Sequence, residues 1–203
     1  MAGKYSIKNA WNFFLHRILH ISIGKEHYLR LVIDIEDTNK RLEGFDLPVK
    51  ELVFEDFLLG DPKEFTPSKL SFIKSRLNDP NYKCYGIMEN GNLVYSTWIS
   101  LHKLGLSVDT KPIYLADDEG LLEDSYCAPS ARGRGIHGKM NIFRIKKLYE
   151  FGKKKVIVII LDGNTPAMKV QLKNGFEDLG TFYNGYFLGF KVNTLKKEKF
   201  DGK

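Results

Sequence analysis

Apolar and polar positions follow two different periods along this chain, and the changes of period predict its helices and strands. Continuous or alternating apolar runs predict strands over 49–54, 82–89, 93–102, 120–127 and 156–161, with closing strands over 181–186 and 186–192. Apolar residues at helical spacing predict helices that begin near Thr66, Ile136 and Thr165. Helices and strands that alternate in this way are typical of an α/β domain.

Turn signals and strand composition indicate how these strands pair. Asn90-Gly91 and Asn184-Gly185 are strong hairpin signals, so each predicts an antiparallel pair. The run over 156–161 is almost wholly apolar and β-branched, as expected for a parallel strand that is covered on both faces. Together with 120–127 and the helix between them, this run predicts a βαβ unit.

The N-terminal part has a different pattern. An aromatic-rich apolar stripe over 8–20 predicts an amphipathic helix, and alternation over 27–35 predicts a strand. The stripe most simply docks on the domain core, although it is also compatible with weak contact with a membrane surface. We therefore predict an N-terminal helix-strand extension over 1–46, a main domain over 47–192 and a basic tail over 193–203.

Composition narrows the class of protein. The chain has 203 residues and a formal charge of +6, but its lysines are spread and no aromatic-interleaved basic motif accompanies them, so no nucleic-acid partner is expected. Cys84 and Cys127 show no metal-ligand spacing, and no secretory signal is evident. We expect reduced thiols, a cytoplasmic location and no metal. No apolar run has the length needed to span a bilayer.

The most informative stretch is 131–140, which reads Ala-Arg-Gly-Arg-Gly-Ile-His-Gly-Lys-Met. Glycines at 133, 135 and 138 let the main chain approach a ligand closely. If a helix begins at Ile136, its first N–H groups have no intrahelical acceptor and its dipole favours negative charge. The stretch therefore predicts an anion site, with phosphate as the natural ligand.

Two other phosphate loops also match this stretch in part. The glycine spacing fits the dinucleotide-binding fingerprint, with Asp162 near the position of a ribose-binding acid. It also fits a P-loop, except that Met140 stands where a hydroxyl must bind magnesium. Both motifs need a buried strand that leads directly into the loop, whereas Pro129 interrupts that approach. A dinucleotide-binding oxidoreductase stays as a distant alternative.

Arg132-x-x-Gly135-x-His137 resembles the pyrophosphate loop of the GNAT superfamily of acyl-CoA-dependent N-acyltransferases, whose pattern is Arg/Gln-x-x-Gly-x-Gly/Ala. Downstream, Asn164-Thr165-Pro166-Ala167 and Gly175-Phe176 look like the Asn-x-x-Ala helix and the terminal Gly-Phe of the same superfamily. The resemblance covers roughly 48–192. His137 departs from the usual small residue.

The resemblance implies a GNAT-like α/β fold, in which helices flank a central mixed sheet whose parallel strands splay apart. It also implies acetyl-CoA as co-substrate, with its pantetheine arm in the gap between those strands. The residues that would bind it are Ser125, Tyr126, Cys127, Arg132, Gly133, Arg134, Gly135, Ile136, His137 and Asn164.

The implied reaction is direct transfer of an acetyl group to a primary amine of an unidentified small-molecule or peptide acceptor. Relatives often use an acid on the strand before the loop as base, which points to Glu123 and then Asp124. Gln171 stands where many relatives have a tyrosine acid. The alternative is a non-catalytic acyl-CoA-binding regulatory domain. Either protein could form a homodimer.

Overall fold

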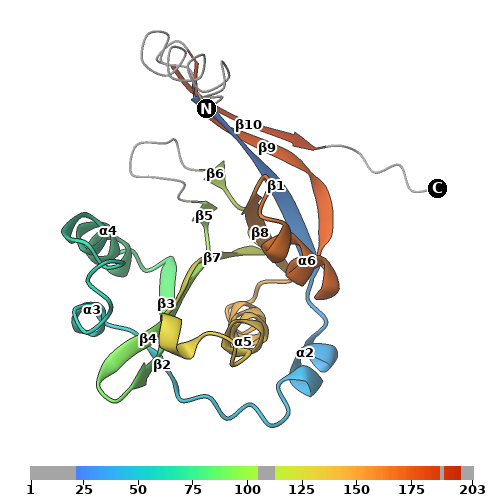
Figure 1. Cartoon of the computed structure of the whole chain (residues 1–203). Helices are drawn as coiled ribbons and strands as arrows, with labels where there is room; N and C mark the ends of the chain where they lie inside the picture. Colours follow the sequence, from blue (N-terminus) through green and yellow to red (C-terminus); the bar gives the residue numbers. More distant parts are fainter. Residues whose placement is uncertain (1–21, 105–112, 188–189, 198–203) are drawn as a thin grey trace, which may run out of the picture. The chain divides into compact units, whose positions relative to one another are not determined.

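The computed structural model describes residues 22–104, 113–187 and 190–197 (Figure 1). The chain divides into two compact units. The larger unit covers 30–158, and the smaller one combines 1–29 with 159–203. The helix predicted over 8–20 and the last residues of the predicted tail lie outside the described residues. The boundaries predicted at 46/47 and 192/193 stay predictions.

The larger unit is built on a mixed sheet, as the sequence predicts. Its strands lie in the order β8–β7–β4–β3–β2, and only β7 and β8 are parallel neighbours. A separate two-stranded sheet pairs β5 with β6. The bounds are β2 (Val49–Glu51), β3 (Tyr82–Glu89), β4 (Asn92–Ser100), β5 (Lys103–Leu104), β6 (Ile113–Tyr114), β7 (Glu119–Cys127) and β8 (Lys155–Leu161), of which the last extends into the smaller unit.

Helices cover both faces of this sheet (Figure 1). On one face, Phe57 stacks on Trp98 with ring centroids 6.0 Å apart, and on the other face the α5 residue Phe143 meets Tyr85 at 5.3 Å. Trp98 and Tyr95 are almost completely buried between these layers. The helices are α2 (Ile35–Arg41), α3 (Phe54–Phe57), α4 (Pro67–Leu77), the 3₁₀ turn η1 (Pro129–Ala131) and α5 (Ile136–Glu150).

Local signals explain several of these elements. Thr66 caps α4, because its hydroxyl accepts from the Lys69 N–H at 3.4 Å and Pro67 occupies the first helical position. Asn90 and Gly91 have φ values of +50° and +77°, as a type I′ hairpin turn requires. These two predictions are confirmed.

The smaller unit contains an antiparallel pair and a short helix. β9 (Glu177–Phe187) pairs with β10 (Phe190–Lys197), and β9 is also hydrogen-bonded to β1 (Ser22–Val32), whose first residues belong to this unit. α6 (Thr165–Lys173) begins where the sequence predicts. His27 of β1 lies 3.2 Å from Asp162 and 3.0 Å from Asp178.

Two sequence expectations are corrected. Asn184-Gly185 is not a turn, because Asn184 pairs with Asn193 and Gly185 with Val192 inside one continuous ladder. The second strand therefore runs to Lys197 rather than ending at position 192. Helix α2 was not expected; its signal is Asp34, whose carboxylate accepts from the Glu36 and Asp37 N–H groups at 2.9 and 3.0 Å.

Candidate functional site

The predicted acidic pair lies at a β-bulge in β7. Glu123 pairs with Trp98 and Ser125 with Thr97, so Asp124 is the extra residue on the bulged strand. Asp124 has φ +27°, which is unusual for a residue other than glycine. The bulge separates the two carboxylates: the Asp124 side chain is 41% exposed, whereas that of Glu123 is 8% exposed.

One side of β7 is open beyond the bulge. The parallel ladder joins residues 119–122 of β7 to residues 155–158 of β8 and then ends, although β7 continues to Cys127. Within the described residues, no ladder pairs that side of 123–127. Main-chain N–H and C=O groups on this side can therefore bind an extended ligand that carries amides. Ser125, Tyr126 and Cys127, which were expected to bind one, lie here.

The glycine loop follows directly, and its backbone has the predicted form. Gly133 and Gly135 have φ values of +76° and +72°, and a Cβ at either position would meet no atom within 4 Å. The first helical bond of α5 runs from the Lys139 N–H to the Gly135 carbonyl. In the described part of the chain, the N–H groups of 133–138 have no backbone acceptor. The loop thus presents open donors at a helix N-terminus.

The two arginines of this loop differ in their contacts. Arg132 Nε donates to the Cys127 carbonyl at 3.2 Å. Arg134 donates through both Nη atoms to Glu89, at 2.9 and 2.7 Å, in a bidentate pair that joins the loop to the end of β3. This hydrogen-bonded cation lowers the pKa of Glu89. Of the other expected residues, Ile136 buries its side chain and can offer a ligand only its main chain.

His137 faces a polar row on β4 and β7. Its Nδ1 lies 2.9 Å from the hydroxyl of buried Tyr95, and Thr97 and Ser125 share a hydrogen bond of 2.7 Å. Desolvation, and then the nearby Arg144 guanidinium, lower the pKa of His137 from 6.5 to about 4. The residue as a whole is exposed, so solvent still reaches part of it. The ring is neutral at pH 7.

This pKa shift predicts a pH-dependent stability. The unfolded chain binds a proton on His137 below pH 6.5 and the folded protein resists it, so stability falls as the pH drops from about 6.5 towards about 4. We expect a loss of about 1 kcal/mol, smaller than the shift implies because the ring is partly solvated. Urea unfolding across this range would measure it. His137→Asn, which keeps an acceptor near Nδ1, should show a shallower slope; parallel curves would contradict the prediction.

Glu123 is held in a buried ion pair. Its carboxylate lies 2.5 Å from Arg76 Nη2 of α4, and both side chains are 8% exposed. Three aromatic rings surround the guanidinium, at centroid distances of 4.5, 4.9 and 5.5 Å for Phe72, Tyr82 and Trp98. A carboxylate held in this way is poorly placed to accept a proton from a substrate.

Asp124 has a more open environment. Its nearest cation is Lys69, at 3.9 Å, and that lysine makes a closer contact with Glu64. The Asp124 carboxylate thus keeps access to solvent beside the open side of β7. Of the two acids that the sequence singles out, it is the better placed to meet a ligand.

Arg144 supports the bulge from the α5 side. Its Nη1 donates to the Trp98 carbonyl at 3.2 Å and to the Glu123 carbonyl at 3.1 Å, while Nη2 donates to Asn141. The side chain is almost completely buried, and this burial lowers its pKa. Sequence reasoning missed Arg144. Met140 follows Ile136 by four residues and Arg144 follows Met140 by four, so this spacing places Arg144 on the buried face of the helix.

The remaining expected residue, Asn164, belongs to the smaller unit. Its side-chain oxygen accepts from the Ala167 N–H at 3.3 Å and caps α6. In the same helix, Gln171 is 5% exposed, and its Oε1 has no hydrogen-bond partner within the described residues. In the larger unit, burial raises the pKa of the Cys127 thiol, which argues against a nucleophilic thiolate.

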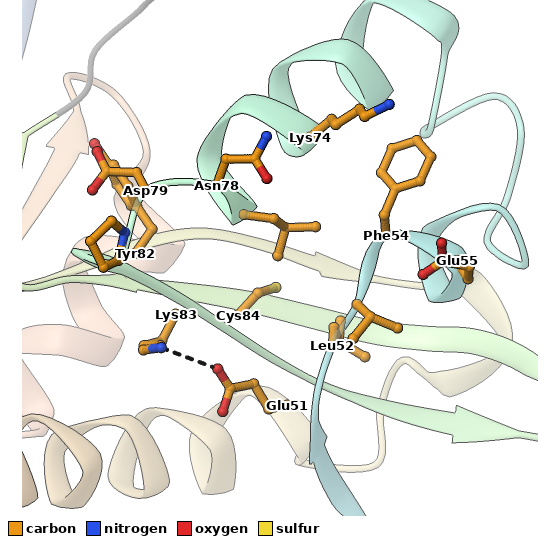
Figure 2. A pocket seen from close by; sticks show the side chains of 13 residues that line it. Glu51, Leu52, Phe54, Glu55, Lys74, Asn78, Asp79, Tyr82, Lys83 and Cys84 are labelled. Carbon is orange, nitrogen blue, oxygen red and sulfur yellow. Dashed lines mark ion pairs between the residues drawn. The ribbon is translucent and has the colours of Figure 1, made fainter.

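Two pockets lie on the α3/α4 side of the larger unit. One, of about 530 Å³, lies between α3, the end of α4 and the start of β3 (Figure 2). Its charges are largely paired: Glu51 meets Lys83 at 3.5 Å, and Asp79 meets Lys103 at 2.7 Å. The other, of about 510 Å³, is lined by 59–62, the β3–β4 hairpin and the end of β7.

The described ranges contain no cluster of three or more His, Cys, Asp or Glu side chains that could hold a metal ion. They contain no helix with both the length and the apolar character needed to cross a membrane.

Comparisons with known proteins rest on structure alone, since neither a family model nor a curated protein matches the chain. A protein of unknown function from Staphylococcus epidermidis superposes with a TM-score of 0.58 at 14% identity, over 84% of this chain and 64% of that one. A protein from Novosphingobium aromaticivorans, assigned as a GNAT-family acetyltransferase, superposes with a TM-score of 0.51 at 12% identity, over 80% of this chain and 63% of that one.

A third structure is a fungal multidomain β-N-acetylglucosaminidase with a glucosamine N-acetyltransferase region. It gives a TM-score of 0.54 at 16% identity, over 87% of this chain and 22% of that one. The chain spans a little under two thirds of the length of the first two proteins. Identities this low establish the fold and nothing finer. The chain has the fold of the GNAT acetyltransferases.

Proposed function

We propose that this protein is an acyl-CoA-dependent N-acyltransferase that moves an acetyl group from acetyl-CoA to a primary amine. The observation that carries the proposal is the continuity of the open side of β7 with the glycine loop. The open side of β7 presents main-chain groups that suit the amides of pantetheine, and the glycine loop presents unengaged N–H groups that suit a pyrophosphate. The fold of the GNAT acetyltransferases supports the same function.

In this proposal acetyl-CoA supplies an activated thioester, and the protein supplies position and proton transfer. The main chain at 125–127 orients the pantetheine arm, and the loop from Arg132 to His137 holds the pyrophosphate. Asn164 fixes the start of α6. Asp124 accepts the proton of the amine, because Glu123 is engaged by Arg76. His137, neutral at pH 7, adds no charge that would oppose this transfer.

A second candidate is a domain that binds acyl-CoA without catalysis. The buried Arg76–Glu123 pair favours it, because it removes one expected base, and so does Gln171 in the place of a tyrosine. This candidate and the enzyme both bind CoA, but only the enzyme releases thiol when an amine is added.

Thermal unfolding with acetyl-CoA, CoA, NAD and ATP tests the donor site, because a ligand that binds only the native state raises the unfolding temperature. We expect acetyl-CoA and CoA to raise the unfolding temperature, and NAD and ATP to leave it unchanged. Thiol release from acetyl-CoA with a panel of amino sugars, amino acids, polyamines and peptides then separates the two candidates. A rise with NAD alone would contradict both and favour the dinucleotide-binding alternative.

Gly135→Ala is expected to weaken CoA binding about tenfold, because an alanine at φ +72° strains the loop and displaces its N–H groups. Gly44→Ala is the matched control. Gly44 has φ +71° and open surroundings, but it lies in the segment between α2 and β2, outside the glycine loop. Calorimetric titration of both variants would measure the difference. Equal losses of affinity would show that backbone strain in general, and not this loop, is responsible.

A further inference from the structure

A row of polar side chains joins the glycine loop to the open side of β7. Tyr95 and Thr97 of β4 are completely buried, whereas Ser125 of β7 is exposed. The Thr97 and Ser125 hydroxyls are 2.7 Å apart, and the Tyr95 hydroxyl lies 2.9 Å from His137 Nδ1. Apolar side chains of similar size would fill this layer without the cost of burying hydroxyls, so packing alone does not account for the row.

The Tyr95 phenol connects these two hydrogen bonds. Burial raises the pKa of Tyr95, while the Arg144 guanidinium, and then hydrogen bonding with the Ser125 and Thr97 hydroxyls, acts in the opposite direction. Both hydroxyls therefore lie beside the phenol oxygen. A neutral phenol donates one hydrogen bond and accepts others. The row is thus continuous from His137, through Tyr95, to Ser125, and the residues at its two ends are exposed.

Each of these three groups can accept a proton on one side and donate one on the other. A hydroxyl gives up its own proton as it takes another, and a neutral imidazole does the same through its two nitrogens. Arg144 favours donation, because its charge lowers the pKa of both Tyr95 and His137, second only to the effect of burial on each. Water can return a proton to the ring, since His137 is exposed.

We propose that Ser125, supplied with protons through Tyr95 and His137, protonates the thiolate that leaves when acetyl-CoA is consumed. The inference rests on the proposed function, because it requires CoA along the open side of β7. It assigns a use to a buried phenol that the proposed function leaves without one.

The proton balance closes without a further reactant. The amine nitrogen bonds to the acetyl carbon, the carbon–sulfur bond breaks, and the sulfur takes the Ser125 proton. Ser125 takes the proton of Tyr95, Tyr95 takes the Nδ1 proton of His137, and Nε2 takes one from water. The proton that Asp124 receives from the amine neutralises the resulting hydroxide. Exchange with water then returns the imidazole to its first tautomer.

The first test follows the ionisation of the thiol of bound CoA by its ultraviolet absorbance, with S-methyl-CoA as the match that has no ionisable proton. A hydrogen bond from Ser125 favours the thiolate, so Ser125→Ala should raise the pH at which the bound thiol ionises by about 1 pH unit. Tyr95→Phe should raise it by about half as much, because Ser125 still donates. The double variant should match Ser125→Ala alone, since Tyr95 acts only through Ser125.

Tyr85→Phe is the matched control. Tyr85 is another buried tyrosine, it pairs with Thr97 across β3 and β4, and its ring packs on Phe143 rather than on His137. This variant should ionise bound CoA like the unmodified protein. If the double variant exceeds Ser125→Ala by the full effect of Tyr95→Phe, the two residues act independently and the relay is overturned. An unchanged midpoint in Ser125→Ala overturns the contact with sulfur.

Turnover provides the second test. With an amine that supports thiol release, Ser125→Ala, Tyr95→Phe and His137→Asn should each lower kcat about a hundredfold and leave KM for acetyl-CoA unchanged. The asparagine keeps an acceptor near Nδ1 but cannot pass a proton on from water. A raised KM with an unchanged kcat would show that the row only shapes the donor site, and would overturn the relay.

These outcomes also separate the relay from the proposed function. If CoA does not raise the unfolding temperature, the proposed function fails and the relay fails with it. If CoA binds but no amine releases thiol, the ionisation of the bound thiol still decides the role of Ser125. If CoA binds and none of the three substitutions moves that ionisation, the proposed function stands and the relay is overturned.

Discussion

Replacing Arg76 with methionine is expected to lower the free energy of unfolding by about 3–5 kcal/mol. Methionine keeps the aliphatic part of the side chain, but it removes the guanidinium, which stacks on the aromatic rings and supplies the cation that lies 2.5 Å from Glu123. At 8% exposure, the Glu123 carboxylate receives little compensation from water. Urea unfolding at pH 7 would measure the loss.

The double variant Arg76→Met with Glu123→Gln identifies the cause. Once the carboxylate is neutral, most of the loss should be recovered, because no buried charge is left to compensate. Lys83→Met serves as the exposed control, since it breaks the surface pair with Glu51 and should cost below about 1 kcal/mol. A double variant as unstable as Arg76→Met alone would show that stacking on the aromatic rings, and not the ion pair, stabilises this region.

Gly86→Ala is expected to lower the free energy of unfolding by about 2–3 kcal/mol. A Cβ at this position would lie 2.4 Å from the Tyr95 carbonyl oxygen and 2.6 Å from Leu52 Cδ1. The carbonyl belongs to the backbone of the neighbouring strand, so β3 and β4 must separate slightly to admit the methyl group. Thermal and urea unfolding would both report the change.

Gly138→Ala is the matched control for this substitution. A Cβ there meets no atom within 4 Å, and the residue lies in the first turn of α5. Alanine favours helix over glycine, so this variant should be unchanged or more stable by up to about 1 kcal/mol. If both variants lose the same stability, steric contact with Tyr95 is not the reason for the cost at Gly86.

The hairpin signals show what sequence could and could not predict about the fold. Asn90-Gly91 separates two strands and forms the turn, whereas Asn184-Gly185 has the same composition and lies inside a ladder. The difference comes from the flanks, since β-forming aromatic residues continue on both sides of the second dipeptide. The pairing of complete strands outweighs the preference of two residues.

The candidate site divides in a similar way. The glycine loop is local in sequence, so its spacing was enough to find it, and the resemblance to the superfamily then pointed to the acidic pair on the strand before it. Glu89 and Arg76 were missed, because each meets its partner across 45 or more residues: Arg134 is 45 residues from Glu89, and Glu123 is 47 from Arg76. The local pattern around them gives no sign of that contact.

One helix spans both halves of the candidate site. α5 begins where the glycine loop ends, and two turns later its Arg144 binds the carbonyl of Glu123, next to the bulge. Arg144 lies eight residues after Ile136, which corresponds to a rise of about 12 Å along the helix axis. The helix therefore links the glycine loop to the β-bulge that carries Asp124. A shift of this helix would therefore misalign the glycine loop and the bulge of β7 together.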